Sequence, residues 1–171
     1  MILPTELLTG IPPTASYATI TGLIVLESIL PLSPFVPTLG LLLVAGGLAQ
    51  SGALNLPAII ACAAAGAVLG DLQAQQTGYR LGDGLRGSRL GRRIPTSLWE
   101  RASAATRRWG RSAVLVCRFV PLLRTVAPHA AGAAGVSYRR LAPFSLAAGL
   151  AWASMESGVG YAVAAGWSWV W

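Results

Sequence analysis

The chain contains no lysine and one histidine, and only six of its 171 residues are acidic. Without lysine it cannot form a Walker-type phosphate-binding loop, which excludes a coupled ATPase within this chain. Gly-x-Ser-x-Gly and His-Glu-x-x-His motifs are also missing, so little remains for an intramembrane hydrolase or metalloprotease to work with. We therefore expect neither enzymatic activity nor a cofactor.

Cysteine is equally scarce. Cys62 and Cys117 lie far apart in the sequence, with no neighbouring cysteine or histidine. This spacing indicates neither a metal site nor a disulfide framework. Both cysteines lie in apolar runs, where a thiol behaves as a small buried hydrophobe.

Apolar residues are abundant. They make up 54% of the chain, charged residues make up 11%, and the mean hydropathy is +0.59. This composition predicts an all-α integral membrane protein of one compact unit. The apolar runs cover residues 17–32, 35–49, 53–69, 112–134 and 141–165. Several approach the roughly 20 residues that span a bilayer, whereas others are short or interrupted by proline.

These runs divide the chain into three parts. Residues 1–16 contain three prolines and are predicted to form a short interfacial segment. Residues 17–166 are predicted to form a single membrane domain. The terminal residues 167–171 alternate tryptophan with other residues, which is typical of an interfacial aromatic belt.

The positive charge is concentrated in residues 80–111. Nine of the thirteen arginines lie there, accompanied by only two acidic residues, Asp83 and Glu100. Because short loops rich in arginine stay on the inner side of the membrane, we expect this loop to be cytoplasmic. The alternative, a nucleic-acid-binding patch, is disfavoured because membrane segments flank the loop.

Within this loop the sequence predicts an amphipathic helix. Ser97 and Glu100 have the spacing of a capping box at a helix start. Trp99, Ala102, Thr106 and Trp109 can then share one side, with arginines around the rest. Such a helix is expected to lie on the anionic leaflet as an anchor; gathering substrate is the less favoured alternative.

Prolines interrupt two apolar segments at corresponding places in the two halves of the chain. Phe-Val-Pro occurs at 35–37 and again at 119–121, each followed by a run of alanine and glycine. Paired broken segments of this kind are the best sequence indicator of a transporter site. Two kinked spans without a transport role are the alternative. The predicted hinge or helix-break residues are Pro31, Pro34, Pro37, Pro121 and Pro128.

Arg118 and Arg124 lie inside the second of these segments. An arginine at bilayer depth costs roughly 2.5–3.5 kcal/mol on insertion scales, so two of them need a partner, a wet cavity or a function. On an unbroken helix their side chains would point about 120° apart, but a break at Pro121 lets both turn towards one cavity. Because a guanidinium binds phosphate in a bidentate manner, the pair predicts a substrate-binding site for a phosphate-sized anion.

Three acids, Glu27, Asp71 and Glu156, lie in or at the ends of apolar runs. Each can pair statically with an arginine, or it can take up a proton and couple proton movement to transport. We expect them to balance charge or carry protons. His129 follows Pro128 and is a secondary candidate, since a lone histidine is more often simply hydrogen-bonded.

The order of these motifs resembles the DedA family of membrane proteins, also called the SNARE-associated or VTT-domain family. The Arg-Phe-x-Pro-x-x-Arg-Thr core at 118–125 is specific, and matches extend over residues 27–161. They include Glu27, Gly70-Asp71, Ala131-Gly132, Trp152 and Gly160-Tyr161.

The resemblance implies a fold with two oppositely oriented re-entrant helical hairpins, together with transmembrane helices. It also implies a lipid flippase or scramblase of the bacterial inner membrane, and undecaprenyl phosphate as an anionic carrier lipid that such proteins move. By position, Arg118 and Arg124 resemble the family's essential arginines, and Glu27 resembles the acid of the first hairpin. Many relatives carry a second acid just after the hairpin proline, where this chain has Thr38-Leu39. Either Asp71 or Glu156 replaces it, or transport is uncoupled.

We therefore expect a multi-pass transporter of an anionic lipid phosphate, whose partners are lipid and membrane rather than nucleic acid. Two alternatives remain open: a broad phospholipid scramblase, and a non-transporting adaptor that uses the basic loop. The small-residue run at 61–67 permits a homodimer without requiring one.

Overall fold

The computed structural model describes residues 12–29, 37–82, 84–89 and 91–167. The regular elements in these ranges are all helical, as the composition predicted. Predicted features at residues 1–11, at Pro31 and Pro34, and at residues 168–171 lie outside the described part.

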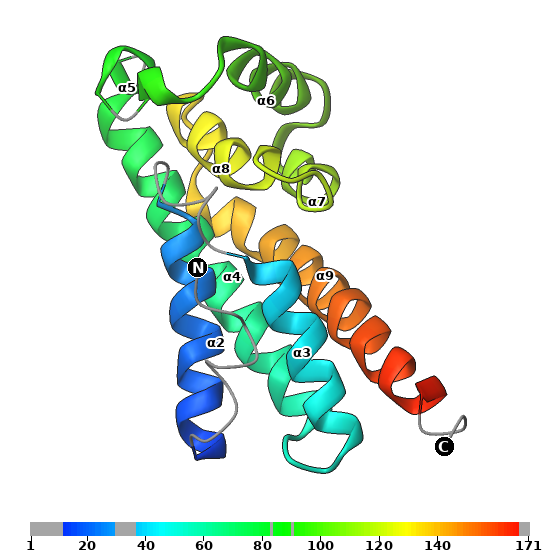
Figure 1. Cartoon of the computed structure of the whole chain (residues 1–171). Coiled ribbons are helices and arrows are strands. Elements are labelled where there is room, and N and C mark those ends of the chain that lie inside the picture. The colour runs from blue at the N-terminus through cyan, green and yellow to red at the C-terminus, as the bar shows by residue number, and fades with distance from the viewer. Residues whose placement is uncertain (1–11, 30–36, 83, 90, 168–171) are drawn as a thin grey trace.

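The described part of the N-terminal half contains three helices. They are α2 (Pro13–Glu27), α3 (Thr38–Gln50) and α4 (Leu56–Leu81). α2 and α3 run in opposite directions, and α4 runs diagonally through the molecule (Figure 1). α2 begins four residues before the predicted apolar run because Pro13 is compatible with the first helical turn. α4 is capped by the side chain of Asn55, which accepts a hydrogen bond from the amide of Ala58 at 3.0 Å.

The C-terminal half contains a group of short helices followed by one long helix. They are α5 (Gly84–Gly87), the 3₁₀ turn η2 (Gly91–Arg93), α6 (Thr96–Trp109), the 3₁₀ turn η3 (Gly110–Ser112), α7 (Ala113–Cys117), α8 (Leu123–Ala133) and α9 (Tyr138–Trp167). α5 to α8 lie together at one end of the molecule, and α9 extends towards the other end (Figure 1).

Close helix contacts hold the two halves together. α3 packs on α9, and α4 packs on both α8 and α9. A side chain at Gly46 of α3 would collide with the backbone of Ser157 in α9, and one at Gly78 of α4 would collide with the backbone of His129 in α8. Small residues therefore let these backbones approach as membrane helices commonly do.

The main apolar core lies between α2, α3, α4 and α9. It includes the fully buried side chains Ile20, Ile24, Leu42, Ile59 and Trp152. A smaller core lies under α6, where Trp99 and Ala102 pack with Leu85, Val126 and Ala130. The main core thus holds α2 and α3 together, and the smaller core holds α8 against α6.

The amphipathic helix of the basic loop exists as α6, but two details of its prediction are wrong. The N-cap is Pro95 and no side chain caps the helix, so Ser97 and Glu100 do not form a capping box. Most of the apolar side is covered by α8 and Leu85, which bury Trp99 and Ala102, so it is not free to enter a leaflet; Trp109, at the end of that side, is 44% exposed.

Pro128 was predicted to be a hinge or helix break, and this is wrong: it lies inside α8, which continues through it. A proline in a helix removes one backbone hydrogen bond, and neighbouring helices can offset that loss. α8 packs on both α4 and α6. Pro143 is likewise accommodated inside α9.

Among the described helices, α4 alone is long and apolar enough to cross a membrane by length and composition. α3 is a shorter apolar helix. α4 carries Asp71 at its centre, and that side chain is 2% exposed.

Candidate functional site

A pocket of about 390 Å³ lies where the end of α2, the start of α3, the break between α7 and α8, and the middle of α9 meet. Its lining combines two guanidinium groups, two carboxylates and apolar side chains. The lining residues are Glu27, Pro37, Thr38, Leu39, Arg118, Phe119, Pro121, Leu122, Arg124, Trp152, Met155 and Glu156. We call it the central pocket.

The break between α7 and α8 brings the two arginines to this pocket. α7 ends at Cys117, Arg118 caps it, and α8 begins at Leu123. Pro121 has no amide hydrogen to continue α7, and Leu122 adopts a positive φ of 63°, which is costly for leucine. Backbone bonds from Val120 to Cys117 and from Arg124 to Val120 close the turn. Arg118 and Arg124 therefore both line the pocket, although one straight helix would have separated them.

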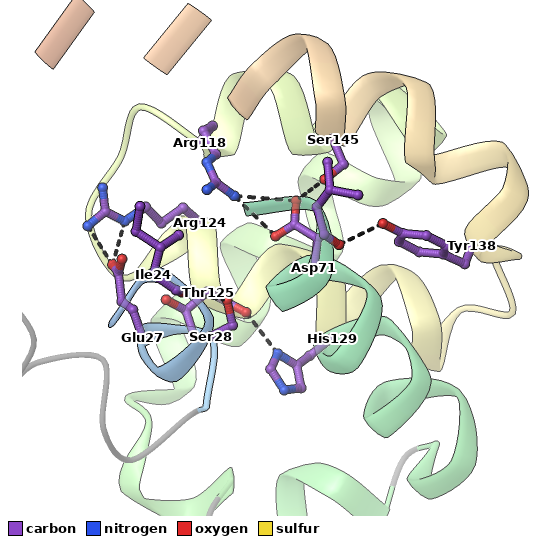
Figure 2. A network of polar contacts seen from close by, with 11 residues as sticks. Ile24, Glu27, Ser28, Asp71, Arg118, Arg124, Thr125, His129, Tyr138 and Ser145 are labelled. Atoms are coloured by element: carbon purple, nitrogen blue, oxygen red, sulfur yellow. Dashed lines mark hydrogen bonds and ion pairs between the residues drawn. The ribbon is translucent and has the colours of Figure 1, made fainter. Parts of the chain in front are cut away.

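Arg118 is held by Asp71. Its Nη1 donates to both carboxylate oxygens of Asp71, at 3.1 and 3.3 Å (Figure 2). The hydroxyl of Ser145 in α9 donates to the same carboxylate. The side chains of this pair are 6% and 2% exposed, so the charges are sequestered from water. The ion pair joins α4 to the α7–α8 break.

Arg124 instead links the end of α2 to the start of α3. Its Nε donates to Glu27 Oε1, and its Nη2 donates to the Thr38 hydroxyl, each at 2.7 Å. Glu27 is the last residue of α2 and Thr38 is the first of α3. Oε1 of Glu156 in α9 lies 3.9 Å from Arg124 Nη1. One guanidinium thus contacts three helices besides its own.

Trp152 forms the floor between the two arginines. Its ring centroid lies 4.9 Å from the guanidinium carbon of Arg118 and 5.1 Å from that of Arg124. Its indole Nε1 donates to Glu156 Oε1 at 2.5 Å. Because the negative face of an aromatic ring attracts cations, Trp152 helps to keep both guanidinium groups at the pocket.

Two buried polar atoms at this site have no hydrogen-bond partner among the described residues. They are Nε of Arg118 and Oε2 of Glu156. An unsatisfied buried donor or acceptor costs about 1–3 kcal/mol, so such atoms call for an explanation. Together they offer one donor and one acceptor to a ligand or to water.

The structure therefore places Arg118, Arg124, Glu27 and Glu156 on one pocket, with Asp71 directly behind Arg118. Pro37 and Pro121 also line it. His129 does not; its Nδ1 lies 2.8 Å from the carbonyl oxygen of Thr125, and its ring points away from both arginines (Figure 2).

Sequence reasoning missed Thr38, Ser145 and Trp152 as site residues. A signal for two of them exists: Ser145, Trp152 and Glu156 are spaced seven and four residues apart, which places them on one face of α9. Thr38 directly follows Pro37, and its hydroxyl accepts a hydrogen bond from Arg124 there.

Metal ligation is not indicated in the part of the chain that the structure describes. There, no three His, Cys, Asp or Glu side chains lie close enough together to hold a metal ion.

Comparison with known proteins gives a match to the VTT domain over residues 36–162, well over half of the chain. This range includes Asp71, Arg118, Arg124 and Glu156, whereas Glu27 precedes it.

Individual relatives are bacterial membrane proteins. The chain is 29% identical to protein DedA of Escherichia coli K12, over 85% of this chain and 67% of the relative. It is 33% identical to inner membrane protein YghB of the same strain, over 80% of this chain and 62% of the relative. It is also 30% identical to an uncharacterized membrane protein of Mycobacterium tuberculosis H37Rv, over 76% of this chain and 58% of the relative.

The chain thus spans about two thirds or less of the length of these relatives. No solved structure shows a significant match to it.

Proposed function

This chain belongs to the DedA family of VTT-domain membrane proteins, and on that basis we propose that it transports an anionic lipid phosphate across the bacterial inner membrane. An undecaprenyl phosphate-type carrier lipid is the substrate that the family resemblance favours. The proposed transport unit is a single membrane domain over residues 17–166.

The observation that carries this proposal is the meeting of Arg118 and Arg124 on one pocket beside Trp152. Permanently charged, planar guanidinium groups suit phosphate oxygens, and apolar neighbours exclude competing water. The lining residues Leu39, Phe119 and Met155 are each about half exposed, so hydrocarbon can lie next to the charged group. A phosphate attached to a lipid chain fits this combination of surfaces.

The charge balance of the site supports proton coupling. Two arginines face three acids, Glu27, Asp71 and Glu156, so the fully ionised site already carries an excess negative charge. An incoming phosphate would repel these carboxylates at short range in a medium of low dielectric. Binding is therefore favoured when one carboxylate takes up a proton. Glu156 is the proposed proton carrier because its Oε2 has no described partner.

The remaining acids have different proposed roles. Asp71, bonded to both Arg118 and Ser145, is proposed to position the Arg118 guanidinium rather than to exchange protons. Glu27 is proposed to balance the charge of Arg124 until the Arg124 guanidinium leaves it to bind the substrate phosphate.

The helix breaks supply the proposed path. α2 and α3 run in opposite directions, and α7 and α8 lie at the other end of the molecule (Figure 1). The end of α2, the start of α3 and the α7–α8 break all line the central pocket. This arrangement supports two oppositely oriented re-entrant hairpins, since interrupted backbone at bilayer depth is tolerated beside a cavity. Pro37 and Pro121, at the two breaks, are the proposed hinges.

Reconstitution tests the proposal. Purified protein in vesicles is expected to move a fluorescent polyprenyl phosphate between leaflets faster than protein-free vesicles do, with a rate that depends on a pH gradient. A transport rate that does not depend on the pH gradient would contradict proton coupling. Absence of transport by correctly oriented protein would contradict the proposed function.

A broad phospholipid scramblase is the second candidate. The central pocket carries both signs of charge together with an aromatic face, and these features also suit a zwitterionic headgroup. Equal rates for phosphatidylcholine and the polyprenyl phosphate in the same vesicles would favour the scramblase.

A further inference from the structure

A second pocket, of about 330 Å³, lies between α5, α6 and α8. Its lining residues are Gly82, Leu85, Arg86, Trp99, Ser103, Thr106, Arg107, Ala130, Ala133, Ala134 and Val136. None of them lines the central pocket. We call it the α6 pocket.

The α6 pocket has an apolar floor and polar walls. Leu85, Trp99 and Ala130 are buried members of the smaller apolar core. Two arginines and two hydroxyl groups stand above them, namely Arg86, Arg107, Ser103 and Thr106. The lining therefore offers both hydrogen-bond donors and hydrocarbon contact.

Arg86 is held in place at this pocket. Its Nη2 donates to the Ser103 hydroxyl at 2.5 Å, and its guanidinium carbon lies 5.7 Å from the centroid of the Trp99 ring. Trp99 is itself fixed by a hydrogen bond from Nε1 to the carbonyl oxygen of Gly91, at 3.2 Å. A guanidinium fixed in this way loses less conformational entropy when it binds a ligand.

Among the described residues that line the α6 pocket, the charged side chains are all arginines, unlike those of the central pocket. No described acid lines it, and neither Arg86 nor Arg107 forms an ion pair with a described residue. Two guanidinium groups beside an apolar floor create a positive potential that an anion can neutralise.

A competing explanation is that these arginines interact with the carbonyl groups at a helix C-terminus, because such groups attract cations. At the end of α8, however, the carbonyls of Ala130, Ala131 and Gly132 already accept hydrogen bonds from the following amides. The arginines are not needed to satisfy them.

We propose that the α6 pocket is a second anion site that binds a phosphate group, carried by a lipid headgroup or by a free phosphate compound. Arg86 and Arg107 would contact the phosphate oxygens, Ser103 and Thr106 would add hydroxyl contacts, and Trp99 would support the uncharged part of the ligand. The site is separate from the central pocket: Arg124 lies in the first turn of α8 and Ala133 at its end, about 14 Å apart along a helix.

A charge-matched pair of variants tests this proposal in the full chain in neutral detergent. Arg86→Gln/Arg107→Gln removes both guanidinium groups of the α6 pocket. Arg89→Gln/Arg101→Gln removes two exposed arginines of the same basic loop that do not line it. Comparing the two doubles cancels any contribution from the central pocket and from overall charge.

Two ligands separate the sources of phosphate. Pyrophosphate binding is measured by equilibrium dialysis, and dihexanoyl phosphatidic acid binding by native mass spectrometry, with dihexanoyl phosphatidylcholine for comparison. The Arg86→Gln/Arg107→Gln protein is expected to lose about tenfold or more in affinity, whereas the matched double stays within about twofold of wild type. Loss of affinity for phosphatidic acid alone identifies a lipid headgroup site, and loss of affinity for both ligands identifies a general phosphate site.

Unchanged affinity in the Arg86→Gln/Arg107→Gln protein overturns the proposal, as does equal loss in the matched double, which would indicate diffuse attraction by the whole basic loop. Absence of wild-type binding to either phosphate ligand also overturns it. Should the pocket double not fold, Ala133→Glu places a negative charge at an exposed edge of the pocket and must lower affinity if the proposal holds.

Discussion

The two arginines of the central pocket are restrained to different degrees. Arg118 lies almost wholly out of water and is paired with a carboxylate that also accepts a bond from Ser145. The Arg124 side chain is 14% exposed and shares its donors among Glu27, Thr38 and Glu156. Arg124 is therefore the guanidinium that we propose exchanges a protein partner for a substrate, whereas Arg118 is proposed to stay paired with Asp71.

Replacing Asp71 should expose this difference. Asp71→Asn leaves the buried Arg118 charge without its counterion, so we expect the free energy of unfolding in detergent to fall by about 3–5 kcal/mol. The double variant Asp71→Asn/Arg118→Gln removes both charges and should lose less than the sum of the two single changes. Strict additivity in this cycle would show that the ion pair contributes nothing to stability.

At the same scale, the sequence predicted which charged residues gather but not how they pair. Arg118, Arg124 and the three acids stand out because charge is rare in apolar runs. Pairing Arg118 with Asp71 and Arg124 with Glu27 spans 47 and 97 positions, and no local spacing rule reaches that far. Trp152 was missed as a site residue because a tryptophan in an apolar run resembles ordinary core.

At the scale of elements, two prolines of the same apolar run differ in outcome. Pro121 stands in a true break, next to a leucine with positive φ, whereas Pro128 is absorbed within α8. Proline chemistry alone does not separate these cases, because packing on α4 and α6 decides whether the helix continues after a proline.

Leu122 provides a test of the break. Its φ of 63° disfavours a β-branched side chain far more than it disfavours glycine. We expect Leu122→Val to lower the free energy of unfolding by about 1–2 kcal/mol more than Leu122→Gly does. The comparison is made by chemical denaturation in one detergent; equal losses would mean that the turn relaxes to another conformation.

The α3–α9 contact supplies a second test at this scale. Gly46→Val adds atoms to a space that the backbone of Ser157 already fills, so the two helices must separate. We expect the free energy of unfolding to fall by about 1–3 kcal/mol or more. Gly158→Ala on the same helix α9 meets open space and should be neutral or stabilising by up to about 1 kcal/mol. Thermal unfolding of both variants checks the contrast, and a Gly46→Val protein as stable as wild type would refute the close packing.

For the whole molecule, composition and charge distribution predicted a helical membrane protein, and the family comparison bears out the membrane assignment. The position of α6 was harder to foresee. An amphipathic sequence predicts that the apolar side of the helix is covered, but it does not distinguish coverage by lipid from coverage by protein. Here α8 does.

Orientation remains a prediction at this scale. Arg92, exposed in the basic loop, is replaced by cysteine in a Cys62→Ala/Cys117→Ala background. Because the loop is expected on the cytoplasmic side, a membrane-impermeant maleimide should label it only after the cells are opened. Labelling of intact spheroplasts would place the loop outside.

The most direct test of the whole account is the transport rate of a polyprenyl phosphate by Arg124→Gln in reconstituted vesicles, beside Arg101→Gln as a charge-matched control outside both pockets. The account predicts that Arg124→Gln moves the lipid no faster than protein-free vesicles, while Arg101→Gln keeps the wild-type rate. A folded Arg124→Gln protein that transports at the wild-type rate would contradict it.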